Sequence, residues 1–261
     1  MIKIDINLIK KLRNITGAGI IDCKNSLILS NGNIKNAIIE IRKLGMLKIS
    51  KIKKKCINGI INVKKFNNYG IILEINCQTD FASKSKEFKK FTIDIINIII
   101  KNNFKYIQNI KKINYFLKTN IINLFNKIKE YVIIKRINIL KNNIIEIYNH
   151  NNYIGVLIKA NFIQKKILKK IAMHIASEKP KFINIENIPY NFINDEYKIQ
   201  NIIIKKTKII KIILLGKIKK YIYNITLFNQ QFIFNNLFKI KEIINKKNSL
   251  IYNFIRYELG E

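Results

Sequence analysis

Apolar residues recur at helical spacing in three short segments at the start of the chain. The first segment begins after Asp5, a residue type that caps helix N-termini. Its apolar positions share one face and are Leu8, Ile9, Leu12 and Ile15. The sequence TGAG predicts its end, a second helix is predicted from an Asp22 cap, and a third runs from residue 34 to Gly45. These predict a three-helix module over residues 1–55, with 48–55 as a charged linker.

The next segment alternates apolar and polar residues, which is typical of strands. Residues 57–77 predict a β-hairpin with Asn67-Asn68 in its turn. Helical spacing then returns, with Phe88, Phe91, Ile95 and Ile98/Ile99 on one face. The same order recurs over residues 143–180, where Asn151-Asn152 marks the turn and Pro180 closes the helix. The repeat predicts two related subdomains, over residues 56–140 and 141–261.

The last third of the chain is helical and then mixed. Residues 191–222 predict one or two long helices with a break near Thr207, so we expect an antiparallel helical hairpin inserted at about residues 187–226. That hairpin could pair with a second copy of the chain to form a homodimer, or lie on its own core. Residues 224–234 resemble a strand, and a final helix and strand follow. The predicted fold class is α+β.

Charge adds one function class to consider. A net charge of +33 is typical of proteins that bind nucleic acid or an anionic membrane surface. Lysine is however scattered along the whole chain together with Ile and Asn, which is the bias of an AT-rich coding sequence. Aromatic residues are not interleaved with the basic ones as in stacking platforms. We therefore attribute most of the charge to composition, expect no specific nucleic-acid partner, and keep a basic RNA- or ribosome-binding protein as the alternative function.

Residues that carry enzyme chemistry are sparse. Cys23, Cys56 and Cys77 are far apart and form no CxxC pair, and His150 and His174 form no local metal motif. No phosphate-binding, dinucleotide-binding or hydrolase motif is present. We expect no catalysis, no metal and no cofactor. The N-terminus lacks a signal-peptide layout and no apolar run spans a bilayer, so we expect a cytoplasmic protein without membrane contact.

Thr79, Asp80 and Phe81 stand where the first hairpin ends and its helix begins. The five residues CQTDF, 77–81, contain no Ile, Asn or Lys, although these three types dominate elsewhere. Local physics favours Asp80 or Ser83 as a helix cap with Phe81 packed inward, because caps are common. The alternative leaves Phe81 exposed as an apolar anchor beside a carboxylate.

Two stretches resemble signatures of the bacterial elongation factor Ts family. They are LRNITGAGIIDCKNSL and YGIILEINCQTDFASKSKEF, and weaker matches follow in the family's order up to residue 261. The resemblance implies an N-terminal module like a ubiquitin-associated domain. It also implies guanine-nucleotide exchange on elongation factor Tu, the GTPase that carries aminoacyl-tRNA. It reverses the local interpretation, because Thr79, Asp80, Phe81 and Ala82 then form an exposed wedge that dislocates Mg²⁺.

The resemblance also implies further contacts with the partner. The matching positions are Arg13, Ile20, Ile21 and Lys24 in the first module, and His150, Ile233 and Phe234 in the second half. Three departures from the family pattern lead us to expect weaker binding with exchange retained. Ala82 replaces the usual Val, Gln231 replaces the usual Pro, and the chain ends at Glu261 without a further C-terminal helix.

Overall fold

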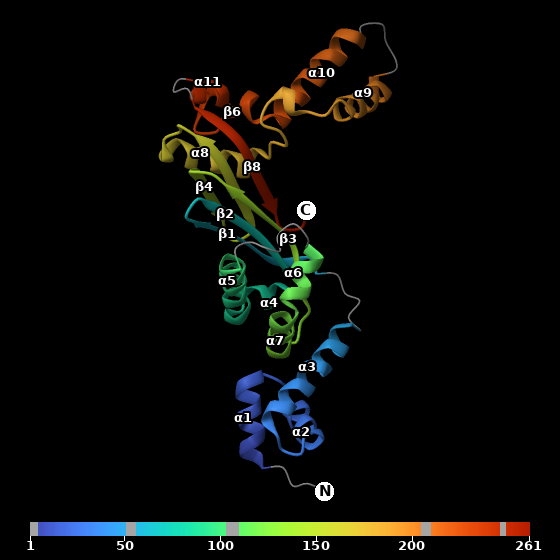
Figure 1. Cartoon of the computed structure of the whole chain (residues 1–261). Helices are drawn as coiled ribbons and strands as arrows, with labels where there is room; N and C mark the ends of the chain where they lie inside the picture. The colour runs from blue at the N-terminus through green and yellow to red at the C-terminus, as the bar shows by residue number, and fades with distance from the viewer. Residues whose placement is uncertain (1–4, 51–55, 103–109, 205–209, 246–248) are drawn as a thin grey trace. The chain divides into compact units, whose positions relative to one another are not determined.

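The computed structural model describes residues 5–50, 56–102, 110–204, 210–245 and 249–261, and it contains both helices and strands (Figure 1). The predicted α+β class, with three helices ahead of the hairpins, is confirmed. Contacts divide the chain into two compact units. The first unit comprises Met1–Asn62, Leu73–Asn138 and Glu258–Glu261, and the second comprises Val63–Ile72 and Ile139–Tyr257. The division at residues 1–55, 56–140 and 141–261 stays a prediction.

Three helices form the start of the first unit. They are α1 (Ile6–Thr16), α2 (Ile20–Leu29) and α3 (Ile34–Ser50). The Asp5 carboxylate caps α1 by accepting from the Asn7 N–H at 2.9 Å, and Gly17 ends the helix at φ 70°. The cap predicted for Asp22 is wrong, because α2 begins two residues earlier with Gly19 at its N-cap. The Asp22 carboxylate instead pairs with Lys48 of α3 at 2.9 Å.

Gly45 lies inside α3 and does not end it, so the predicted helix boundary is wrong. A Cβ atom at this position would lie 3.0 Å from Ile122 Cγ2 and 3.2 Å from Asn126 Oδ1 of α7 (Lys118–Ile128). The glycine therefore allows two helices to approach closely instead of providing a left-handed cap. The predicted linker is helical up to Ser50, and residues 51–55 lie outside the described residues.

The first predicted hairpin and its helix are present in the structure. Strands β1 (Asn58–Phe66) and β2 (Tyr69–Cys77) meet at a turn in which Asn67 takes φ 50°, and β3 (Val132–Lys141) completes the sheet in the order β1-β2-β3. Along the chain, β2 is followed by α4 (Asp80–Lys84), α5 (Lys86–Lys101) and α6 (Ile110–Phe116), and then by α7. The predicted face of α5 is buried at Phe88, Phe91, Ile95 and Ile99.

A buried carboxylate lies at the centre of this sheet. Glu74 of β2 is fully buried, and β3 supplies its cations. Arg136 Nε donates to Glu74 Oε2, and Lys135 Nζ lies 3.3 Å from Glu74 Oε1. Arg136 also donates through Nη2 to the Glu258 carbonyl at 2.8 Å. Burial of a carboxylate is costly unless it is paired, so this contact fixes β2 against β3.

The second unit repeats the hairpin and the helix. Strands β4 (Ile144–His150) and β5 (Ile154–Asn161) pair with Ile144 opposite Ala160 and His150 opposite Ile154, and Asn151 and Asn152 both take positive φ in the turn. Helix α8 (Lys165–Glu178) packs on this hairpin, and β8 (Leu250–Glu258) joins the sheet in the order β4-β5-β8. Both predicted Asn-Asn turns are therefore confirmed.

The remaining elements of the second unit are mostly helical. They are η1 (Ile185–Asn187), α9 (Tyr190–Ile204), α10 (Ile210–Ile225), η2 (Leu227–Asn229), β6 (Gln231–Phe232), β7 (Asn235–Lys239) and α11 (Ile240–Asn245). Helices α9 and α10 pack against each other, and the predicted break at Thr207 lies outside the described residues. Within the described ranges, no helix is both long enough and apolar enough to cross a membrane.

The strand predicted over residues 224–234 is wrong for most of its length. Helix α10 continues to Ile225, and only Gln231–Phe232 are in a strand. Side-chain hydrogen bonds to the local backbone and between neighbouring side chains favour the turn. The Thr226 hydroxyl donates to the Ile222 carbonyl at 2.7 Å, and the Asn229 amide donates to the Thr226 hydroxyl at 2.9 Å.

A buried histidine links α8 to this turn. Ile233 N–H donates to His174 Nδ1 at 3.4 Å, so the ring proton must lie on Nε2, which is 2.9 Å from Gln230 Oε1. His174 is fully buried, and this burial lowers the pKa of its imidazole below the ordinary value. The neutral ring therefore holds Ile233, one of the positions that the resemblance implies as a contact.

We expect Glu74→Ala to lower the free energy of unfolding by about 3 kcal/mol, because it leaves the partly buried Arg136 without its carboxylate. Urea denaturation of the variant would measure this. Glu40→Ala removes an exposed pair with Lys43 and should cost no more than about 0.5 kcal/mol. Replacing both Glu74 and Arg136 with Met should recover much of the loss. Equal effects of Glu74→Ala and Glu40→Ala would contradict the role assigned to the buried pair.

We expect His174 to make folding less favourable as the pH falls below about 6.5, the ordinary histidine pKa. The pKa of His174 is lower in the folded chain than in the unfolded chain, so the unfolded chain is protonated first as the pH falls. Protonation then stabilises the unfolded chain by up to about 1.4 kcal/mol per pH unit. Chemical denaturation between pH 7 and 5 should show that the stability advantage of the native chain over His174→Gln shrinks with falling pH. A constant difference would rule out this linkage.

Candidate functional site

The corner between β2 and α4 presents the residues singled out by the sequence. Thr79 is the N-cap of α4, and its hydroxyl accepts from the Ala82 N–H at 3.3 Å. Ser85 caps α5 in the same way by accepting from the Phe88 N–H at 3.2 Å. The caps predicted at Asp80 or Ser83 are therefore wrong. The Ser83 hydroxyl donates back to the Asp80 carbonyl at 2.7 Å.

Phe81 points into solvent, so the interpretation of an inward-packed ring is wrong. Its side chain is 82% exposed, whereas the next residue, Ala82, is 8% exposed. An isolated exposed phenylalanine is common, but this one projects from a corner whose backbone is fixed by hydrogen bonds of the Thr79 and Ala82 N–H groups. The ring is thus an apolar anchor on a fixed support.

The Asp80 carboxylate beside this ring is ionised and exposed. Lys84 Nζ lies 2.7 Å from Asp80 Oδ2, one helical turn away. The hydrogen bond from the Lys84 ammonium holds the pKa of the Asp80 carboxyl below its ordinary value. Asp80 can therefore accept hydrogen bonds from a partner at neutral pH.

Glu130 fixes the corner from a distant part of the sequence, and the sequence analysis did not identify it. Its carboxylate accepts two hydrogen bonds from Thr79, one from the N–H at 3.0 Å and one from the hydroxyl at 2.5 Å. Glu130 follows Lys129, which ends α7 in the left-handed region at φ 61°. The only sequence signal is an acidic residue in a chain with few of them, 16 in total.

The residues that precede Thr79 are also fixed by hydrogen bonds. The Asn58 amide donates to the Gln78 carbonyl at 2.9 Å, and the Cys77 thiol donates to the Thr79 carbonyl at 3.1 Å. Cys77 is fully buried, and burial raises the pKa of its thiol to about 12. A thiol that stays protonated and buried is not a nucleophile, so Cys77 serves packing and support.

The candidate partner-binding residues near the N-terminus lie on two helices of the first unit. Arg13 is in the last turn of α1, whereas Ile20, Ile21 and Lys24 lie in the first half of α2. All four residues are exposed, and Ile21 is 74% exposed. Beneath them Leu12, Cys23 and Leu27 form part of the buried cluster of the module. Two neighbouring exposed isoleucines on a packed helix are suited to a partner surface.

The candidate partner-binding residues of the second unit lie at two turns. His150 ends β4 and is exposed, with its Nδ1 3.1 Å from the Tyr148 hydroxyl. Ile233 and Phe234 lie between β6 and β7, and Lys170 Nζ lies 5.4 Å from the centre of the Phe234 ring. The hydrogen bonds and ring contacts of the described residues do not join His150 with the other two.

The acidic, histidine and cysteine residues do not gather into a metal site in the described ranges, where no group of three or more has a suitable arrangement. The two caps and Glu130 hold a corner from which the Phe81 ring projects into solvent. What the corner can do chemically is insert an aromatic ring and accept hydrogen bonds beside it.

Known proteins resemble this chain over its whole length. The model of the family described as Elongation factor TS matches residues 78–261. A relative named Elongation factor Ts from Baumannia cicadellinicola is 39% identical, covering 100% of this chain and 95% of the relative. Those named Elongation factor Ts from Buchnera aphidicola and Escherichia coli are 37% and 33% identical, covering 99% and 100% of this chain and 97% and 93% of the relatives. The chain belongs to the elongation factor Ts family.

Proposed function

We propose that the protein is a guanine-nucleotide exchange factor for elongation factor Tu and acts in translation elongation in the cytoplasm. The observation that carries the proposal is the Phe81 side chain, 82% exposed on a corner that Glu130 and two helix caps hold in place. The family membership supplies the partner. The protein itself makes and breaks no bond, so it is not an enzyme in the usual sense.

Phe81 and Asp80 form the wedge in this proposal. The ring enters an apolar pocket between helices of the GTPase domain, while the exposed Asp80 carboxylate accepts hydrogen bonds beside it. The partner's segments that hold Mg²⁺ and the β-phosphate are thereby displaced. Loss of the ion removes the largest local positive charge from the phosphates, so GDP dissociates.

Exchange follows from negative coupling between the two ligands of the GTPase. Protein and nucleotide weaken each other's binding by the same factor, because the coupling free energy is reciprocal. Incoming GTP therefore displaces the exchange factor in turn. A rigid wedge strengthens this coupling, because the binding energy is not spent on ordering the corner.

Two further surfaces orient the wedge in the proposal. Ile20 and Ile21, with Arg13 and Lys24, bring the N-terminal module onto the GTPase domain. His150, Ile233 and Phe234 contact a second domain of the partner. Gln231 replaces a proline here, but Gln231 pairs with Lys239 across the β6-β7 sheet, and Ile233 is tied to His174. The segment is thus restrained without the proline.

Ala82 affects the support and not the exposed flank of the wedge. Its side chain is nearly buried, at 8% exposure, so the methyl groups that a valine would add point into the first unit. We therefore attribute to Ala82 a small loss of packing beneath the corner, of the order of 1 kcal/mol.

We expect Phe81→Ala to reduce the acceleration of GDP release at least about 30-fold, the loss typical of a buried interface anchor. Stopped-flow release of fluorescent GDP from elongation factor Tu would measure it. Phe162→Ala is a matched control, because Phe162 is 71% exposed and lies outside the proposed surfaces. If both variants behave like the native protein, the wedge lies elsewhere. Failure of the native protein to accelerate release at micromolar concentration would reject the proposed function itself.

We expect Glu130→Gln to weaken exchange about tenfold, because the neutral amide can accept only one of the two hydrogen bonds from Thr79 and that bond is no longer charge-assisted. The effect should appear as a higher concentration for half-maximal acceleration, with the helix content by circular dichroism unchanged. Glu87→Gln removes the same charge from an exposed position of α5 and should have no effect. Equal exchange curves for the two variants would show that Glu130 does not hold the wedge.

A further inference from the structure

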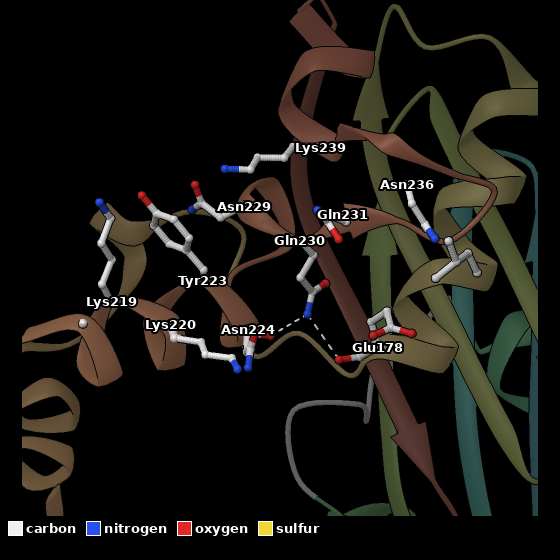
Figure 2. Close-up of a pocket in the computed structure, with 12 residues that line it drawn as sticks. Glu178, Lys219, Lys220, Tyr223, Asn224, Asn229, Gln230, Gln231, Asn236 and Lys239 are labelled. Carbon is white, nitrogen blue, oxygen red and sulfur yellow. Dashed lines mark hydrogen bonds between the residues drawn. The ribbon is translucent and has the colours of Figure 1, made fainter. Parts of the chain in front are cut away.

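A surface cavity of about 840 Å³ lies in the second unit, where α10 meets η2, β6 and β7. Figure 2 shows lysines, an aromatic ring and amides around it, together with the carboxylate of Glu178. Of the positions that the resemblance implies as partner contacts, only Ile233 lines this cavity. The wedge formed by Asp80 and Phe81 belongs to the other unit.

The cavity is positively charged. Lys219, Lys220 and Lys239 line it, whereas Glu178 is the single carboxylate in its lining. Among the described residues, none of the three ammonium groups has a carboxylate partner. Three unpaired cations around one concave surface favour an anionic ligand.

An aromatic ring lies among these cations. Lys239 Nζ is 5.0 Å and Lys219 Nζ is 5.8 Å from the centre of the Tyr223 ring. Lys219, Lys220 and Tyr223 come from the sequence KKYIY, in which two lysines precede two tyrosines. The fold also brings Lys239 to the Tyr223 ring, a grouping that the sequence alone does not show. An aromatic face between lysines is the combination that stacks a nucleobase while cations neutralise its phosphates.

The amide side chains of the cavity divide into two that are hydrogen-bonded, Asn229 and Gln230, and three that are free. Gln230 Nε2 donates to the Glu178 carbonyl at 3.2 Å and to the Asn224 carbonyl at 2.5 Å, which fixes the floor (Figure 2). The side chains of Asn224, Gln231 and Asn236 are exposed and make no hydrogen bond with any other described residue. Free amides can donate to and accept from the edges of unstacked bases.

We propose that this cavity binds single-stranded RNA, with Lys219, Lys220 and Lys239 on the phosphates and Tyr223 stacked on a base. An acidic peptide would use the cations alone and would gain nothing from the ring. Inorganic phosphate or polyphosphate would likewise make no stacking contact with Tyr223. Double-stranded RNA keeps its bases stacked and cannot place one on the ring. The combination of cations, ring and free amides therefore favours a single strand.

The test is fluorescence anisotropy of a labelled oligouridylate of about 12 nucleotides, titrated with the full chain at about 50 mM salt. Replacing Lys219, Lys220 and Lys239 together with Gln should weaken binding at least about tenfold and reduce the salt slope by about 2. The matched control replaces Lys165, Lys166 and Lys169 of α8 with Gln, which removes the same charge from exposed positions of the same unit. Its affinity should stay within about twofold of the native value.

Tyr223→Ala should weaken oligouridylate binding about tenfold, whereas Tyr223→Phe keeps the ring and the affinity. Polyphosphate and double-stranded RNA of similar length should compete poorly, and Phe81→Ala should bind RNA like the native chain. An equal loss of RNA affinity in the two triple Lys→Gln variants would show that binding follows net charge and would overturn the proposal. So would unchanged binding by Tyr223→Ala, or competition by polyphosphate or an acidic peptide as strong as that by RNA. Circular dichroism of each variant checks its fold.

Discussion

The ion pair of Glu74 with Arg136 is the constraint on which the presentation of the wedge depends. A fully buried carboxylate in the middle of β2 is tolerated only because β3 brings Arg136 and Lys135 to it. Arg136 extends the contact to the Glu258 carbonyl, and Lys135 donates to the carbonyl of Glu261. The pair therefore specifies one register of β2 against β3. Because β2 ends three residues after Glu74, that register also determines where the corner begins.

The corner itself is held by polar contacts and not by apolar packing of its tip. Thr79 is joined to Glu130 through two hydrogen bonds and caps α4 with the same hydroxyl. Half-buried polar networks of this kind fix geometry, because each lost bond leaves a partly desolvated group unsatisfied. The exposed ring of Phe81 can therefore remain in water without collapsing onto the surface. In the second unit His174 and Gln230 play the same part for Ile233 and the floor of the basic cavity.

Elements set by local periodicity could be predicted from the sequence, whereas features set by distant contacts could not. The helical face of Phe88 to Ile99 and the Asn-Asn turns follow from spacing and from the tolerance of Asn for positive φ. Gly45 looked like a helix end, because its close approach to Ile122 is invisible along the chain. Glu130 lies 51 residues from Thr79 and leaves no periodic signal. Cap statistics placed Phe81 inside, and only the resemblance placed it outside.

Lys84 gives the tip of the wedge a counter-ion of its own. In a chain with a net charge of +33, an exposed carboxylate could rotate toward any neighbouring lysine, but Asp80 is already engaged one turn along its own helix. Water and salt screen an exposed pair of this kind, so an incoming donor can replace the ammonium at little cost. In the proposed complex, a cationic donor of the partner would replace one cation with another, and the net charge at the tip would hardly change. The contribution of the tip to affinity would then depend less on ionic strength than that of the surrounding lysines.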